Sequence, residues 1–434
     1  MRNFERYETK PLECWQKMKE LRRDHVRHLW KSREKDEPLI IGTAEIFQSL
    51  PAGLGDYAGF GLGPNFGGII RDRDLTIKCL EALEVRGFGR DICGICRVNL
   101  GSMFLGIQTR SRSGEAVKPD FCYQLHACEP LGKTTQLMSE EYNIPYFIVE
   151  MPFVGREGCT KYLISQMQDA IEFMEKVTDR EYDDERLIEA VYNEWRSMVL
   201  WARVCELNKA IPAPIDLRHL ASLIMPLWTG KHRRDTAEFY QMLFDEVQDR
   251  VQNKISARSL ERCRLMHFGQ WPWYLPSLLR FPERYGAVFI GADVSFGTYG
   301  AFVAQEDGSW KTAKTLEEQG IELKTREDAL RSLVELYMFD SPMIRSFFLF
   351  SSKSREHLKM LEDWHADAAV FNLAYDCKGV TAAQMETRLA FQKKGVPSLL
   401  YEVSSADPRD FTESQIINRF ESFLETLGLG KLEE

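Results

Sequence analysis

Short apolar runs alternate with helical patterns along most of this chain, and loops join the two kinds of segment. The clearest of these runs span residues 38–42, 143–149, 265–269, 286–291, 368–373 and 396–402. Their length and composition are those of buried strands. Strands that alternate with helices build a parallel sheet that is covered by helices. We therefore predict an α/β fold, in which ligands collect where a strand passes into a helix.

The helical patterns divide the predicted fold into four parts. With 434 residues, the chain is long enough for two or three domains. Residues 160–254 keep a helical period, which predicts a helical subdomain between the strand-rich parts. The predicted boundaries are 1–36 for an N-terminal helical segment, 37–158 for a first α/β domain, 159–256 for the helical subdomain and 257–434 for a second α/β domain. Both α/β domains are expected to be Rossmann-like or flavodoxin-like parallel-sheet domains.

The charge balance limits the kinds of partner that the chain can have. It contains 56 basic and 65 acidic residues, a net charge of −9, so no basic surplus can neutralise the phosphates of a nucleic acid. No apolar run is long enough to span a membrane, and residues 1–10 lack the apolar core of a signal peptide. Ten cysteines without a secretion signal favour the reducing cytoplasm. We thus expect a cytoplasmic protein without a nucleic-acid or membrane partner.

The segment 90–97 carries two thiols and two arginines around a glycine. The spacing of Cys93 and Cys96 fits a metal knuckle, a redox disulfide or chance. A zinc knuckle would need a second pair with this spacing, and the sequence has no other. Arg90 and Arg97 either pair with carboxylates or offset the negative charge of a cluster and its substrate.

Cys128 and Cys377 share the setting of Cys93, because each lies in a loop before a predicted helix. The positive end of a helix lowers the pKa of a thiol and stabilises a negative cluster. Three thiolates from distant loops suit an iron–sulfur cluster that keeps one iron open for chemistry. Taken singly, each is more often an inert buried cysteine. Cys96 and Cys122 are either further ligands or neighbours that pack under the cluster.

Three other features bear on a possible site. His126, two residues before Cys128, is either a structural histidine or a proton donor to a bound carbonyl. The glycine-dense stretches 49–55 and 59–64 line a pocket or form surface loops, and their spacing does not match a dinucleotide fingerprint. The residues before Lys133 lack the first glycine of a phosphate loop, so we expect no ATP site in this chain.

These stretches resemble the family of benzoyl-CoA reductase and 2-hydroxyacyl-CoA dehydratase subunits. The likeness covers most of the chain and is carried by residues 93–101, Cys128 with 143–147, 375–378, 395–397 and Glu402. Within the family, the larger catalytic (B-type) component of benzoyl-CoA reductase is most similar, on stretches 51–55 and 86–94 and on the turn at 271–273. Dehydratase subunits more often carry an acidic residue where this chain has Ala52 and Gly53.

The resemblance implies one [4Fe-4S] cluster, held by Cys93, Cys128 and Cys377. It also implies a sister iron–sulfur subunit of similar fold and an ATP-hydrolysing activator that delivers electrons from ferredoxin. The implied activity is reduction of benzoyl-CoA to a cyclohexadiene-carboxyl-CoA by radical electron transfer. The negative charge that develops at the thioester oxygen needs a Lewis acid or a proton donor, and the candidates are an iron with only three cysteine ligands and His126. The residues expected to line the acyl-CoA pocket, where packing is the competing explanation, are Gly53, Gly55, Trp271 and Trp273.

Three alternatives remain open at this point. In a 2-hydroxyacyl-CoA dehydratase subunit, the radical would expel a β-hydroxyl instead of taking up protons and a second electron. In a partner subunit, the cluster would relay electrons while the substrate lies in the sister protein. A zinc-stabilised structural protein is disfavoured, because the sequence has no second knuckle.

Overall fold

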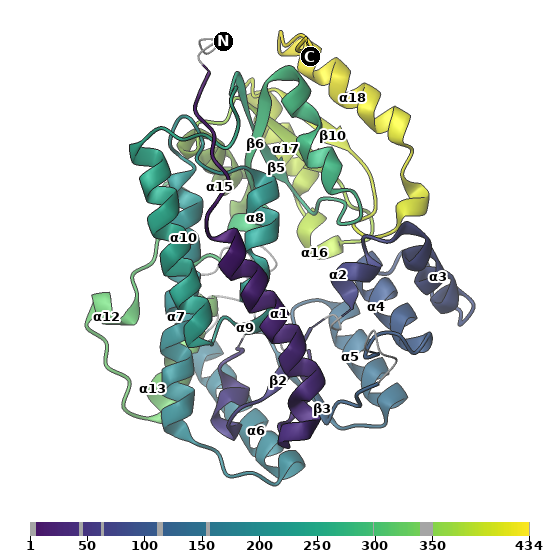
Figure 1. Ribbon diagram of the computed structural model, residues 1–434, viewed down its shortest axis with the longest axis vertical. Coiled ribbons are helices and arrows are strands. Elements are labelled where there is room, and N and C mark those ends of the chain that lie inside the picture. Colours follow the sequence, from purple (N-terminus) through teal and green to yellow (C-terminus); the bar gives the residue numbers. More distant parts are fainter. Residues whose placement is uncertain are drawn as a thin grey trace.

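Two four-stranded parallel sheets, one antiparallel hairpin and the surrounding helices make up the fold (Figure 1). The computed structural model describes residues 6–42, 47–61, 65–110, 116–152, 157–297, 299–338 and 350–433. The two parallel sheets confirm the predicted α/β class with two flavodoxin-like domains. The predicted domain boundaries stay a prediction.

The first sheet has the strand order β2-β1-β3-β4. Its strands are β1 (Leu39–Ile41), β2 (Ala58–Phe60), β3 (Phe121–His126) and β4 (Tyr146–Glu150). All three pairs of neighbours are parallel, so the C-terminal ends of the strands lie at one edge. The predicted runs 38–42 and 143–149 correspond to β1 and β4.

The second sheet has the strand order β10-β9-β5-β6. Its strands are β5 (Cys263–Phe268), β6 (Ala287–Ala292), β9 (Ala368–Asn372) and β10 (Ser398–Tyr401). Every residue of β5, β6 and β9 is buried, as expected for a parallel sheet with both faces covered. A separate hairpin consists of β7 (Phe302–Ala304) and β8 (Trp310–Thr312).

Helices surround each sheet, and three of them begin directly after a predicted cysteine ligand. The helices of the first half are α3 (Arg73–Glu84), α4 (Gly94–Phe104) and α5 (Glu129–Tyr142). Those of the second half are α13 (Arg326–Met338), α15 (Phe350–Asp363), α16 (Lys378–Thr381), α17 (Gln384–Lys393) and α18 (Glu413–Thr426). Short helices and 3-10 turns are α2 (Phe66–Ile69), α11 (Asp293–Gly297), α12 (Leu316–Gln319), η1 (Ser32–Lys35), η2 (Leu50–Leu54), η3 (Pro276–Tyr285) and η4 (Pro408–Asp410).

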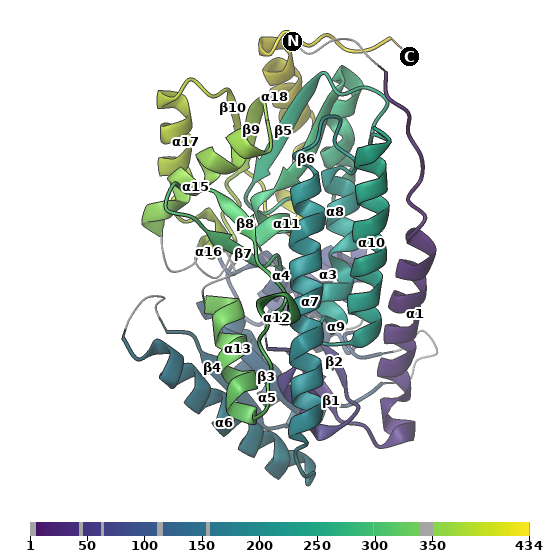
Figure 2. The same ribbon diagram turned by 90° about the vertical axis from the view of Figure 1, so that its left-hand side faces the viewer.

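The helical stretch between the two halves contains one helix that packs on both. This stretch consists of α6 (Cys159–Thr178), α7 (Asp184–Leu207), α8 (Leu217–Leu223), α9 (Met225–Gly230) and α10 (Arg234–Gln252). Trp195, in the first half of α7, packs in the core that contains β1 and β3. Trp201, six residues later, packs in the core of the second sheet. Figure 2 shows α7 and α10 running alongside both sheets, so one rigid element joins the two halves.

Helix α1 (Trp15–Lys31) lies across this helical stretch and contacts α9, α10 and β2 (Figure 1). It begins after a turn in which the backbone N–H groups of Glu13 and Cys14 donate to Glu246. Its apolar face docks on the body of the protein. Only Leu29 among its residues is fully covered, so much of this face borders a cavity.

Acidification is expected to destabilise the fold through buried His267 of β5. Its Nε2 lies 2.8 Å from the Tyr401 hydroxyl, and burial lowers its pKa to about 3 from 6.5. Below pH 6.5 the unfolded chain therefore binds a proton that the folded chain does not, and the free energy of unfolding falls as the pH drops toward 3, by up to about 1.4 kcal/mol per pH unit. Urea unfolding of His267→Phe between pH 7 and pH 4 should show a shallower slope. Equal slopes for the variant and the wild type would contradict this prediction.

Candidate functional site

Each of the three predicted ligands is the residue directly before a helix. Cys93 precedes α4, Cys128 precedes α5 and Cys377 precedes α16, and none of their side chains caps its helix. These three are partly exposed, whereas the other seven cysteines of the chain are buried. The loop-before-helix setting that the sequence predicts is thus present at all three positions. These three are also the only cysteines among the ten, all of which the structure describes, that are not fully buried.

The three thiols come from both halves of the chain and act on one another electrostatically. Burial, then the charges of Cys93 and Cys128, raise the pKa of the Cys377 thiol well above its usual value. A hydrogen bond with Cys96 lowers the pKa of Cys93, and the same bond together with burial raises that of Cys96. Cys93 therefore ionises first, and Cys96 acts as its hydrogen-bond donor.

The chemistry of the three donors suits an iron–sulfur cluster. Within the described ranges, no group of three or more His, Cys, Asp or Glu side chains is arranged to hold a metal ion. In a four-iron cluster each thiolate binds a different iron, so the sulfur atoms do not converge on one point. Three accessible soft thiols at three positive helix ends suit such a negative iron–sulfur group. The assignment of Cys93, Cys128 and Cys377 as ligands stays a prediction.

Asp376 joins the loops of Cys93 and Cys377. Its Oδ2 accepts a hydrogen bond of 3.2 Å from the Gly94 backbone N–H and one of 2.6 Å from the Ser404 hydroxyl. The backbone N–H of Ser405 donates to its other oxygen at 3.0 Å. A Cβ on Gly94 would lie 2.3 Å from Asp376 Oδ2, so only glycine lets the two loops approach this closely.

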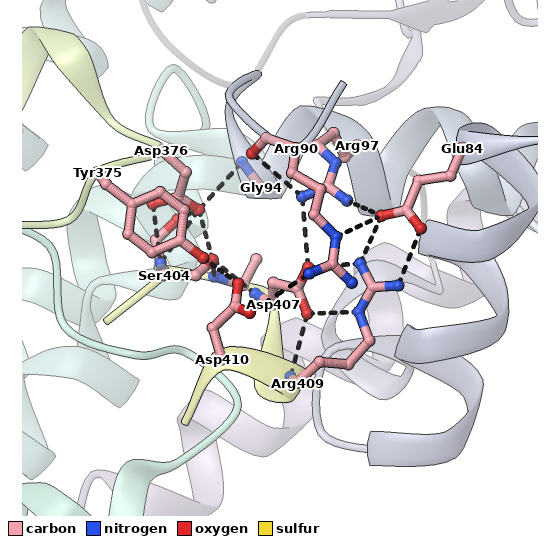
Figure 3. Close-up of polar contacts among 12 residues, drawn as sticks. Glu84, Arg90, Gly94, Arg97, Tyr375, Asp376, Ser404, Asp407, Arg409 and Asp410 are labelled. Carbon is pink, nitrogen blue, oxygen red and sulfur yellow. Dashed lines mark hydrogen bonds and ion pairs between the residues drawn. The ribbon is translucent and has the colours of Figure 1, made fainter. Parts of the chain in front are cut away.

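A buried ion-pair network continues from this point (Figure 3). The Arg97 guanidinium, fully buried, donates to Glu84 at 2.5 Å and to buried Asp407 at 3.4 Å. Arg409 binds the same two carboxylates, each at 2.6 Å. Burial alone would raise the pKa of Asp407, but hydrogen bonds from Arg409 hold it below its usual value. The network therefore stays charged and ties α3 and α4 to the segment after β10.

The second predicted arginine lies at the edge of the same network. Arg90 is half-exposed and reaches Glu84 at 3.3 Å and Asp410 at 3.5 Å. Asp410 also accepts a hydrogen bond from the Tyr375 hydroxyl, two residues before Cys377 (Figure 3). Arg90 and Arg97 therefore both pair with carboxylates of the chain, which was the first of the two alternatives for them.

His126 ends β3 and is held by carboxylates. Its Nδ1 lies 2.7 Å from Glu150 of β4, and its Nε2 lies 3.6 Å from Glu129 of α5. Gly132 allows this position, since a Cβ there would lie 3.0 Å from the ring. The side chain is partly exposed, so a proton could be exchanged with solvent or a ligand. Its role as a proton donor stays a prediction.

A cavity of about 390 Å³ lies between α1, α2, α8, α9 and the turn at 271–273. Its lining is largely apolar and includes the predicted residues Trp271 and Trp273, together with Gly61 from the second glycine-dense stretch, of which residues 62–64 lie outside the described part of the chain. Trp273 also packs on the cluster of side chains around Ala406, and its backbone N–H donates to the carbonyl oxygen of Ser405 at 2.9 Å. This indole thus lies between the cavity and the cysteine loops.

The predicted glycines of the first stretch lie elsewhere. A Cβ on Gly53 would lie 2.3 Å from the ring of Tyr182, so this glycine allows the turn at η2 to pack against the start of the helical stretch. Gly55 has a φ of +97° and faces Arg180. Neither residue lines the cavity between α1 and α9. Their assignment to substrate binding is not supported by this placement and stays a prediction.

Several site residues have no signal in the local sequence. Glu84, Asp407 and Arg409 form the network around Arg97. Glu84 lies in an amphipathic helix and the other two in a polar turn, where charged residues are ordinary and do not mark a site. Asp376 has one available signal, its position next to Cys377. A carboxylate beside a candidate ligand suggests a supporting role.

Comparisons with known proteins place the chain among acyl-CoA enzymes. The family described as 2-hydroxyglutaryl-CoA dehydratase, D-component, matches residues 59–427. The (R)-phenyllactyl-CoA dehydratase alpha subunit of Clostridium sporogenes is 23% identical over 358 residues, which cover 80% of this chain and 79% of that protein. The B component of benzoyl-CoA reductase from Thauera aromatica is 23% identical over 361 residues, 79% of this chain and 78% of that protein. No helix within the described residues is long and apolar enough to cross a membrane.

Proposed function

Because the chain belongs to the family of 2-hydroxyglutaryl-CoA dehydratase D-components, we propose that it is a catalytic iron–sulfur subunit acting on an acyl-CoA thioester. The observation that carries this proposal is the agreement of three features at Cys93, Cys128 and Cys377. Each precedes a helix, each residue is partly exposed, and the charges of the first two act on the third.

The three thiolates would hold a [4Fe-4S] cluster with one iron not bound by cysteine. When bound, such a cluster supplies single-electron transfer to the substrate. The chain's own residues fix the surroundings. Asp376 sets the separation of the loops of Cys93 and Cys377, and Lys353 is buried near Cys377 and donates to the carbonyl oxygens of Val380 and Ala382 at 2.7 and 2.8 Å.

The thioester oxygen gains negative charge when an electron enters the acyl group, and this charge needs a nearby donor. We assign this task to His126, which the Glu150 carboxylate orients through Nδ1. The other ring nitrogen, Nε2, lies beside Gly132 in the first turns of α5. A histidine oriented by a carboxylate is a common arrangement for general acid–base catalysis.

Our first candidate reaction is the reduction of benzoyl-CoA by two electrons and two protons to a cyclohexadiene-carboxyl-CoA. The electrons would come from ferredoxin through an ATP-hydrolysing activator, and a sister iron–sulfur subunit would complete the complex. The apolar, tryptophan-rich cavity and the Ala52–Gly53 turn support this candidate. The similarity to the B component of benzoyl-CoA reductase supports it as well.

The second candidate is the dehydration of a 2-hydroxyacyl-CoA, which releases water and returns the electron. Four dehydratase alpha subunits among the relatives favour it, including those for phenyllactyl-CoA and 2-hydroxyisocaproyl-CoA. The second of these, from Clostridioides difficile, is 21% identical over 364 residues. Because these relatives are alpha subunits, a partner subunit is expected for either reaction.

Product mass after anaerobic turnover separates the two candidates. The complex is reconstituted with its activator, ATP and reduced ferredoxin, and is offered benzoyl-CoA and phenyllactyl-CoA in separate reactions. We expect benzoyl-CoA to gain two hydrogen atoms. Loss of water from phenyllactyl-CoA, with benzoyl-CoA unchanged, would contradict the first candidate and establish the second. A complex without ATP serves as the control and is expected to be inactive.

A further inference from the structure

The cavity beside α1 contains arginines that no acidic side chain neutralises. Within the part of the chain that the structure describes, the guanidinium groups of Arg22, Arg71 and Arg218 have no hydrogen-bond or ion-pair partner, although all three line the cavity. A fourth lining arginine, Arg233, differs because Asp235 binds it through two hydrogen bonds of 3.0 and 2.7 Å. The three unpaired cations leave a net positive charge in a chain whose total charge is −9.

Two of these arginines repel each other. Burial, and then the charge of Arg71, lower the pKa of Arg22, whose Nη2 lies 3.9 Å from the Cβ position of Gly67 on α2. His25, also in the lining, adds no charge at neutral pH, because burial, and then Arg233 and His28, lower its pKa to about 3. Positive charges that lie close together without a carboxylate partner favour the binding of an anion, because the anion offsets their repulsion.

The rest of the cavity is apolar. Trp15, Met18 and Leu21 of α1 line one side, and the neighbouring indoles of Trp228 and Trp273, with ring centres 5.1 Å apart, line another. A volume of about 390 Å³ fits an acyl group with part of its carrier, and lies within the usual range for small-molecule pockets. The ligand that matches this lining therefore has an apolar end and several negative charges.

We propose that this cavity binds the coenzyme A thioester, with the phosphates at Arg22, Arg71 and Arg218 and the acyl end toward Trp273. This assignment rests on the proposed function, since it names where that substrate lies. Trp273 and Ile95 pack on the same side-chain cluster, which contains Ala406, and Ser405 links Trp273 to Asp376 between the cysteine loops. The acyl end is thus directed at the predicted cluster site, while the charged end stays at the rim, where Arg22 and Arg71 are exposed.

Equilibrium binding to the full-length, iron-loaded chain tests this site without turnover. The probes are benzoyl-CoA, phenyllactyl-CoA and the N-acetylcysteamine thioesters of the same acids, which lack every phosphate. For the double variant R22Q/R71Q, we expect the Kd of both coenzyme A thioesters to rise by about tenfold per arginine and that of the phosphate-free thioesters to stay unchanged. The matched control R23Q/R27Q removes two exposed arginines of α1 that pair with Asp24 outside the cavity, and should bind every probe like the wild type.

A second variant tests the apolar part. Ala221→Phe places a ring in the cavity and is expected to weaken binding of all four probes, with thermal unfolding used to confirm that the variant is folded. Unchanged coenzyme A thioester binding by R22Q/R71Q would overturn the assignment. If that variant also kept the wild-type KM in turnover, the proposed function would stand with its substrate bound elsewhere. Specific thioester binding by a chain that takes up no iron and shows no turnover would instead contradict the proposed function and leave the binding site in place.

Discussion

Replacing Cys377 by serine is expected to leave the chain folded but without iron, and to lower turnover by at least about 100-fold. Cys377 is the only one of the three predicted ligands that the second half of the chain supplies. A serine hydroxyl is a hard ligand that does not ionise near neutral pH, so it does not replace a soft thiolate on iron. The measurements are iron and sulfide content after anaerobic purification, the visible absorption of the cluster, and product formation.

The matched control for this variant is Cys159→Ser. Cys159 begins α6 and packs in the first core, away from the thiols that affect Cys377. The Cys159→Ser variant measures how much stability a buried cysteine loses when a hydroxyl replaces its thiol. Its iron content should equal that of the wild type. Full iron content in Cys377→Ser would show that Cys377 is not a ligand. Partial exposure of a cysteine would then no longer support its assignment as a ligand. Zinc in place of iron in the wild-type chain would count against the cluster altogether.

The second large effect is expected for Arg97→Met, which should lower the free energy of unfolding by about 3 kcal/mol. Methionine keeps much of the side-chain volume but removes the buried charge that Glu84 and Asp407 share. Asp407 has no exposed surface, and after the change it keeps Arg409 as its ion-pair partner. Because the network joins the Cys93 helix to the segment after β10, we also expect a lower iron content. Urea unfolding with and without cluster measures the first effect, and iron analysis the second.

Arg90→Met is the control for the network. Arg90 binds Glu84 as well, at 3.3 Å, but half of its side chain is exposed to solvent. Removal of an exposed ion pair should cost less than about 1 kcal/mol. An equal loss of stability in the two variants would show that the buried position of Arg97 contributes nothing, and that the two halves are held together by their apolar contacts alone.

The sequence predicts the strongly apolar strands well and the weak ones poorly. The runs at 265–269 and 368–373 correspond to β5 and β9, whose residues are all buried. Strand β2 falls in a glycine-dense stretch, and glycine lowers strand propensity, so its pairing with β1 comes from the sheet rather than from its own residues. The hairpin of β7 and β8 escapes prediction for a related reason, because strands of three residues give too short an alternation.

The residues of the candidate site also differ in how well the sequence predicts them. The three cysteines can be found because each carries a local signal, a loop followed by a helix. The residues that bring their loops together carry none, since their partners are distant in the chain. Gly94 and Asp376 are 282 positions apart, and Arg97 and Asp407 are 310 positions apart. Only the fold shows that these distant carboxylates and donors lie close together. The unpaired arginines that line one cavity likewise cannot be grouped from the sequence.

Helix α7 has a consequence for how this chain can be divided or recombined. Trp195 and Trp201 lie six residues apart on one helix, yet the first packs in the core of one sheet and the second in that of the other. A cut on either side of α7 would leave one of the two fragments with an uncovered apolar surface. In a chimera that takes one half from a relative, the core of that half would have to pack on a face of α7 that evolved with a different core. The two halves are therefore expected to be inherited together. A substitution in α7 must be compatible with the cores of both sheets.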